Sequence, residues 1–96
     1  MNDKQLYHQK KEAQLKEWKA DIEKIKAKAL MASADVQIEM NHQIDALEKK
    51  IEEGKTKLSD LANAADDVYE SMKTGVESAW DSLKSTVSDA ASKFKN

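Results

Sequence analysis

The chain has 96 residues, of which 35% are charged and 5% are aromatic, and its formal net charge at pH 7 is −2. A sequence with so many charged residues has too little apolar volume for a thick core, whereas the narrow seam between packed helices needs much less apolar volume. Cysteine is absent, which excludes disulfides and thiolate metal sites, and the lack of proline with only two glycines leaves few residues that end helices. The composition therefore predicts an all-α protein.

The charges are distributed unevenly along the chain. Residues 1–28 hold eight lysines and five acids, residues 29–72 hold four lysines and ten acids, and residues 73–96 hold four lysines and three acids. Nucleic-acid binding needs a continuous basic stripe, whereas these lysines are divided between the two ends, so we expect no nucleic-acid partner. The polar N-terminus with no apolar run after it predicts neither a signal peptide nor a membrane span, and we expect a cytoplasmic protein.

Residues 1–14 are mostly helix formers with a weak apolar stripe, which predicts a frayed leading helix. Residues 15–57 form a heptad coiled-coil segment, because apolar or small residues alternate at steps of three and four as far as Val36. After Val36, successive apolar residues are four, four, three and four positions apart. This spacing is a stutter near residues 36–44, which locally unwinds a supercoil. The expected interaction seam, continued to the end of this pattern, consists of Leu15, Trp18, Ile22, Ile25, Val36, Met40, Ile44, Leu47, Ile51, Leu58 and Leu61.

Two places could interrupt this helix. Residues 31–35 could form a bend, with Ser33 or Asp35 as the cap of a following helix, but no glycine or proline lies there and a continuous helix is favoured. Gly54 could end one helix, with Thr56 opening the next. Gly54 is therefore the preferred position for a helical hairpin.

Residues 58–96 change the period of the apolar pattern. Apolar positions recur every eleven residues, which predicts an amphipathic helix with a nearly straight or slightly right-handed seam. This wide apolar face could pack on a protein helix or lie in a lipid interface, and protein packing is favoured because the segment has a net charge near zero. The residues of the partner or lipid face are Val68, Tyr69, Met72, Val76, Trp80, Leu83, Val87 and Phe94.

A resemblance to known proteins lies in the C-terminal run VESAWDSLKSTVSDAASKF, residues 76–94. It resembles the tail of a group of short, functionally uncharacterised bacterial coiled-coil proteins, and the likeness extends back to the run Leu15, Lys16, Glu17 and Trp18. The eleven-residue period is similar in kind to those of apolipoproteins, synucleins and late-embryogenesis-abundant proteins. The bacterial group implies a coiled-coil fold and no catalytic activity.

The charge distribution favours one pairing of helices. A long continuous helix cannot bury its seam alone, so the chain is expected to self-associate as a homodimer or higher oligomer. An antiparallel dimer centred near Met40 places basic residues 1–28 against residues 52–79, and complementary charge selects that orientation. A hairpin folded at Gly54 would set acidic residues against acidic residues, so it ranks second, either alone or dimerised into a four-helix bundle.

No residues form a catalytic or ligand-binding signature. Glu39 and His42 have the Glu-x-x-His spacing of half a di-iron site, but only one copy exists, so a polar surface is favoured. His8 and His42 lack the partners that nucleophilic catalysis requires. We therefore expect no enzyme activity, no cofactor and no metal. The expected function is a coiled-coil scaffold or interaction protein that docks a partner through its C-terminal helix; the alternative is a peripheral lipid- or granule-surface protein or a stress-protective helical protein.

Overall fold

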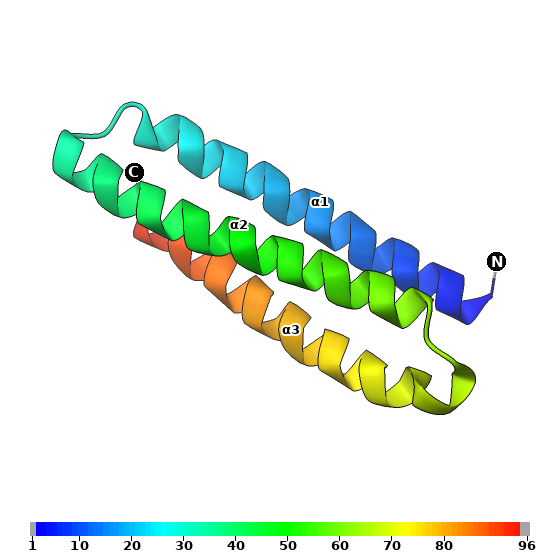
Figure 1. The fold of residues 1–96 in the computed structure, drawn as a ribbon. Helices are drawn as coiled ribbons and strands as arrows, with labels where there is room; N and C mark the ends of the chain where they lie inside the picture. The colour runs from blue at the N-terminus through cyan, green and yellow to red at the C-terminus, as the bar shows by residue number, and fades with distance from the viewer. Residues whose placement is uncertain (1, 95–96) are drawn as a thin grey trace.

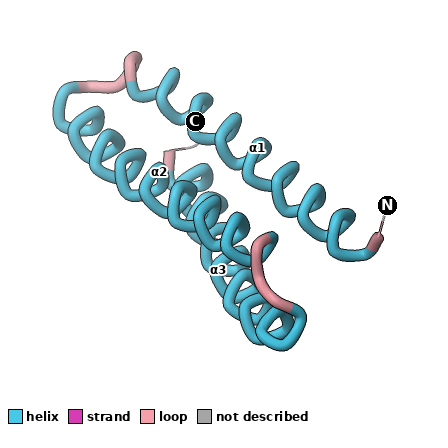
Figure 2. The backbone as a smooth tube through the Cα atoms, turned by 45° about the vertical axis from the view of Figure 1, so that its right-hand side comes forward, coloured by secondary structure: helices cyan, strands magenta, loops and turns pink. Residues whose placement is uncertain are grey.

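A computed structural model describes residues 2–94, which form three α-helices. α1 spans Asp3–Ala29, α2 spans Ala34–Ala62 and α3 spans Asp66–Lys93. The helices run up, down and up (Figure 1, Figure 2), and each of the three helices contacts the other two. The molecule is an elongated bundle of 51 × 21 × 17 Å. The prediction of an all-α protein is confirmed.

The first helix includes the predicted leader, since residues 3–14 belong to α1. Asn2 is its N-cap. The side chain of Asn2 accepts a hydrogen bond from the backbone N–H of Gln5 at 2.8 Å, and the side chain of Gln5 accepts one from the backbone N–H of Asn2 at 3.1 Å. This capping box satisfies two N–H groups that the first turn leaves free, so α1 has a defined start.

The predicted continuous helix across residues 31–35 is wrong, because α1 ends at Ala29 and α2 begins at Ala34. Ser33 is the N-cap of α2 in extended backbone, with φ of −62° and ψ of 159°, as in the weaker alternative of a bend. No residue in the range 2–94 has a positive φ, so this turn needs no glycine. The turn therefore forms without the glycine that usually marks the end of a helix in a sequence.

A second turn divides the segment 58–96, which was expected to be one amphipathic helix. α2 ends at Ala62, and α3 begins at Asp66. At the end of α2, the carbonyl of Ser59 accepts hydrogen bonds from both the backbone N–H of Asn63, at 3.2 Å, and the side-chain amide of Asn63, at 3.1 Å. Acidic residues lie in the first turn of α3, where they are favourable at the positive end of the helix dipole.

The predicted hairpin at Gly54 is also wrong, because Gly54 lies inside α2 and is buried. A Cβ atom at this position would lie 3.0 Å from Cδ1 of Leu83 and 3.3 Å from Cζ3 of Trp80. Glycine is needed here because the side chains of α3 approach the backbone of α2 closely. Gly54 therefore marks a helix contact and not a turn.

All three helices contribute to one core that runs the length of the bundle. The antiparallel orientation that was expected between two chains is found within one chain: Nζ of Lys26 in α1 lies 3.2 Å from Oε2 of Glu48 in α2. A single chain thus buries its apolar seam by folding back twice, so association is not needed for that purpose. The pairing of two chains stays a prediction.

Candidate interaction surfaces

Most residues of the predicted interaction seam lie in the core of the single chain. Val36 is the exception, with 43% of its surface exposed. The buried seam residues, each no more than 8% exposed, are Leu15, Trp18, Ile22, Ile25, Met40, Ile44, Leu47, Ile51, Leu58 and Leu61. These side chains pack on their own chain.

The predicted partner or lipid face of α3 is also covered. Met72 and Phe94 are partly buried against the core, and Val68 is 43% exposed. The buried members of this face are Tyr69, Val76, Trp80, Leu83 and Val87. α1 and α2 therefore occupy the face on which the sequence placed the partner.

A polar cluster joins α1 to α3 near the N-terminal end of the bundle. The hydroxyl of Tyr7 donates a hydrogen bond to the carboxylate of Glu77, and Nζ of Lys11 lies 3.4 Å from the same carboxylate. Burial raises the pKa of Tyr7, and the hydrogen bond to Glu77 raises it further. The hydrogen bond from Tyr7 lowers the pKa of Glu77, with Lys11 and Lys73 adding to the effect. Because these groups satisfy one another within the chain, we assign the cluster a structural role.

The helices α1 and α2 are staggered, so that each extends past the end of the other (Figure 1). Ala29 at the end of α1 lines one hollow with Asn41 of α2, whereas α2 begins at Ala34. Residues 34–40, the α2 overhang, therefore run about 10 Å beyond α1, at 1.5 Å per residue. At the other end, the start of α1 extends past the end of α2 (Figure 1). Residues 3–7 of α1, the α1 overhang, lie there against the start of α3, because Nζ of Lys4 is 2.6 Å from Oδ1 of Asp66.

A row of hollows follows the boundary between α1 and α2. It consists of four adjoining hollows, and neighbouring hollows share lining residues. Counted from the α1–α2 turn, the first and second hollows share Glu23 and Glu48, and the second and third share Lys19. The third and fourth hollows share His8 and Glu12. We call this surface the α1–α2 face. It lies on the side of α2 that looks away from the contact of Lys50 with Thr86 in α3.

Charge changes sign along the α1–α2 face. Near the turn the lining is net acidic, and its charged residues are Glu23, Lys26, Asp45 and Glu48. The second hollow is also net acidic, with the charged residues Lys19, Glu23, Glu48 and Glu52. The third hollow is net basic, and its charged residues apart from histidine are Glu12, Lys16, Lys19 and Lys55. Within residues 2–94, neither Asp45 nor Lys16 forms an ion pair. Both charges are therefore available to a second molecule.

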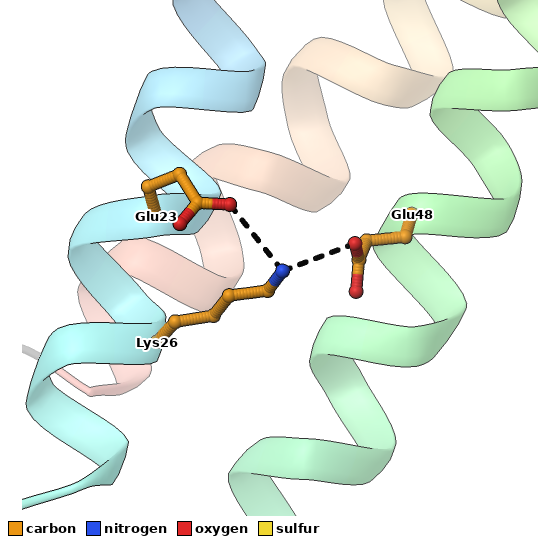
Figure 3. Close-up of polar contacts among 3 residues, drawn as sticks. All are labelled: Glu23, Lys26 and Glu48. Atoms are coloured by element: carbon orange, nitrogen blue, oxygen red, sulfur yellow. Dashed lines mark hydrogen bonds and ion pairs between the residues drawn. The ribbon is translucent and has the colours of Figure 1, made fainter.

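Lys26 bridges the two helices at the acidic end of the face (Figure 3). Its ammonium lies 3.3 Å from Oε1 of Glu23 and 3.2 Å from Oε2 of Glu48. The hydrogen bonds to Glu48 and then to Glu23 raise the pKa of Lys26. Two carboxylates share this one ammonium, so the acidic end keeps its negative charge.

The two ends of the face differ in shape as well as in charge. At the acidic end, Leu30 is 78% exposed and Ile38, on the α2 overhang, is 58% exposed. At the other end, beside the α1 overhang, the hollow includes the side chains of Tyr7, Leu61 and Tyr69. The face thus carries apolar projections at one end and an apolar hollow at the other.

The histidines and their acidic neighbours do not assemble a metal site. Glu39 pairs with Nζ of Lys93, and Nε2 of His8 lies 2.8 Å from Oε1 of Glu12. Across residues 2–94, no group of three or more histidine, cysteine, aspartate or glutamate side chains is placed to hold a metal ion. Nor is any helix in this range long and apolar enough to cross a membrane.

Comparison of the chain with protein families, with curated proteins and with solved structures finds no match. The resemblance to short bacterial coiled-coil proteins therefore stays a prediction.

The sequence pattern did not single out the residues that give the α1–α2 face its character. Leu30 and Ile38 lie off the seam, because they break the three-four spacing of their neighbours. Apolar residues outside the seam were the available signal for an exposed patch. The hollow at the other end had no such signal, since it arises from the stagger of two helices.

Proposed function

We propose that this protein is a non-catalytic helical interaction protein, which acts by binding another protein molecule through its α1–α2 face. The observation that carries the proposal is this row of hollows, with exposed Leu30 lining its acidic end and exposed Ile38 on the adjoining α2 overhang, one turn before Asn41 of the same lining. Exposed apolar side chains next to charged hollows are typical of protein interaction sites. The proposal moves the docking site from α3 to the α1–α2 face, because the apolar face of α3 packs inside the bundle.

The scaffold role expected from the sequence is retained in this form. A bundle with its core filled and its polar cluster satisfied offers a rigid surface, so binding costs little conformational ordering. A cytoplasmic location and an ancestry among short bacterial coiled-coil proteins belong to the same proposal. No step of it requires a metal or a cofactor.

Site-directed photocrosslinking in the producing cell tests the proposal. A photoreactive phenylalanine analogue is placed at position 38 on the α1–α2 face, and, as a control, at position 71, where Ser71 is exposed on α3. We expect discrete protein adducts from position 38 and none of the same mass from position 71. Equal adduct patterns from both positions, or no adduct from position 38, would contradict an interaction role for this face.

A further inference from the structure

We propose that the α1–α2 face binds the same face of a second copy of the chain, forming an antiparallel dimer with two-fold symmetry. This inference rests on the proposed function, because it names the partner of the interaction surface. The argument depends on three properties of the face: the order of its charges, the stagger of its helices and the position of its exposed apolar residues.

The order of charges favours an antiparallel over a parallel pairing of two faces. A two-fold axis perpendicular to the bundle reverses one copy relative to the other, so the acidic end of each face lies over the basic third hollow of the other, while the acidic second hollow lies at the axis against its own copy. A parallel arrangement would instead place every hollow against its own copy, acid on acid at the end as well as in the second hollow, and base on base in the third. In the antiparallel register, the unpaired Asp45 of one copy lies near the unpaired Lys16 of the second copy, and symmetry repeats this contact.

The stagger of the helices makes the shape complementary in the same orientation. Counted from Ala34 on α2 to Asp3 on α1, the middle of the face lies near Glu52. A two-fold axis at this point brings the α2 overhang of one copy beside the α1 overhang of the second copy, where the second copy has no α2. Each α2 overhang then lies past the end of the other copy's α2, beside its α1 overhang.

The same operation pairs the projections with the hollow. Ile38 of one copy comes over the hollow that Tyr7, Leu61 and Tyr69 line in the second copy. A 58% exposed isoleucine would thereby be covered twice in each dimer. Charge order and shape thus select one orientation independently of each other.

Val36 supplies a matched control, because it lies two residues before Ile38 on the opposite side of the same helical turn. Val36 is 43% exposed, close to the exposure of Ile38, but it lies toward the side where Glu39 pairs with Lys93 of α3. Substitution of either residue by glutamate places a charge on an exposed position of the α2 overhang. Only I38E places it in the proposed interface.

Sedimentation equilibrium of the full chain at low salt tests the dimer, with circular dichroism to verify that each variant is folded. We expect a monomer–dimer equilibrium for the wild type, a dissociation constant at least about tenfold higher for I38E, and little change for V36E. We also expect D45K and K16D each to weaken the dimer about three- to thirtyfold, and the double variant D45K/K16D to recover it.

Each remaining outcome overturns a defined part of the inference. A wild-type chain that stays monomeric at millimolar concentration has no such dimer. Equal weakening by I38E and V36E moves the contact away from the α1–α2 face, and a double charge variant that does not recover excludes the antiparallel register. If the chain is monomeric but position 38 still crosslinks to a different protein, the proposed function stands and only the second copy is wrong.

Discussion

The indole rings of Trp18 and Trp80 lie 6.2 Å apart between centroids, at an interplanar angle of 52°, and connect α1 to α3. Gly54 of α2 lies against the same Trp80 ring. Three residues that are far apart in the sequence thus meet in the middle of the bundle. This aromatic pair is therefore a direct apolar contact between α1 and α3.

The first prediction concerns the size of Trp80. We expect W80A to lower the free energy of unfolding by about 3–5 kcal/mol, because it opens a cavity where three helices meet. We expect W80F to cost much less, about 1 kcal/mol, since an aromatic ring remains and Nε1 of Trp80 has no hydrogen-bond partner within residues 2–94. Urea unfolding followed by circular dichroism at 222 nm measures both. Equal losses for the two variants would contradict a role based on packing.

The second prediction compares the two glycines, both in helix interiors. At Gly75, an added Cβ would meet no atom within 4 Å, so G75A should stabilise the protein by about 0.5–1 kcal/mol through helix propensity. At Gly54, the same methyl group would press on Leu83 and Trp80, and we expect G54A to destabilise the protein by about 1–2 kcal/mol. Thermal and urea unfolding of both variants check the sign. Stabilisation by G54A would mean that α2 and α3 separate at no cost.

The third prediction concerns acid stability. The pKa of Glu77 in the folded protein lies below its ordinary value of 4.5, mainly because Tyr7 donates a hydrogen bond to its carboxylate. The stabilisation from Glu77 is therefore present above about pH 4.5 and is lost as the pH falls through the lowered folded-state pKa. We expect E77Q to flatten the loss of stability between about pH 5 and 3, by less than about 1 kcal/mol because the side chain is 46% exposed.

The control for this titration is D81N, on an exposed acid of α3 outside the polar cluster. Urea unfolding at a series of pH values should give D81N the acid slope of the wild type. Y7F should flatten the slope as E77Q does, since it removes the main hydrogen bond that lowers the pKa of Glu77. An unchanged slope in both E77Q and Y7F would remove the cluster from the acid response.

The helical class and the buried positions were accessible from sequence because both depend on local spacing. Ile22 and Ile25, or Leu58 and Leu61, fall on one side of a helix wherever that helix packs. The spacing does not say which surface covers them. We expected a second chain to cover these residues, but other helices of the same chain cover them. The sequence does not distinguish the two cases, since a helix buries its seam equally well against its own chain or another.

The turns were missed because they contain no residue that turns require. No residue in the described range, residues 30–33 and 63–65 included, has a positive φ, so alanine and leucine suffice in these turns. At Gly54 the prediction failed in the opposite way, because a turn was expected and none forms. The missing side chain of Gly54 allows close contact with α3. The α1–α2 face was beyond prediction, because its ends depend on the stagger between helices that only the folded bundle defines.

The last prediction separates protein binding from lipid binding. In the variant W18F, Trp80 is the sole tryptophan, and its side chain lies in the core, 3% exposed in the wild type. Insertion of α3 into a bilayer would require the bundle to open, which costs the burial of Val76, Leu83 and their neighbours. We therefore expect anionic vesicles with brominated acyl chains to leave the fluorescence of Trp80 unquenched in the full-length protein. Saturable quenching would show that the apolar face of α3 reaches the acyl chains, and the lipid-surface function would then replace the interaction role.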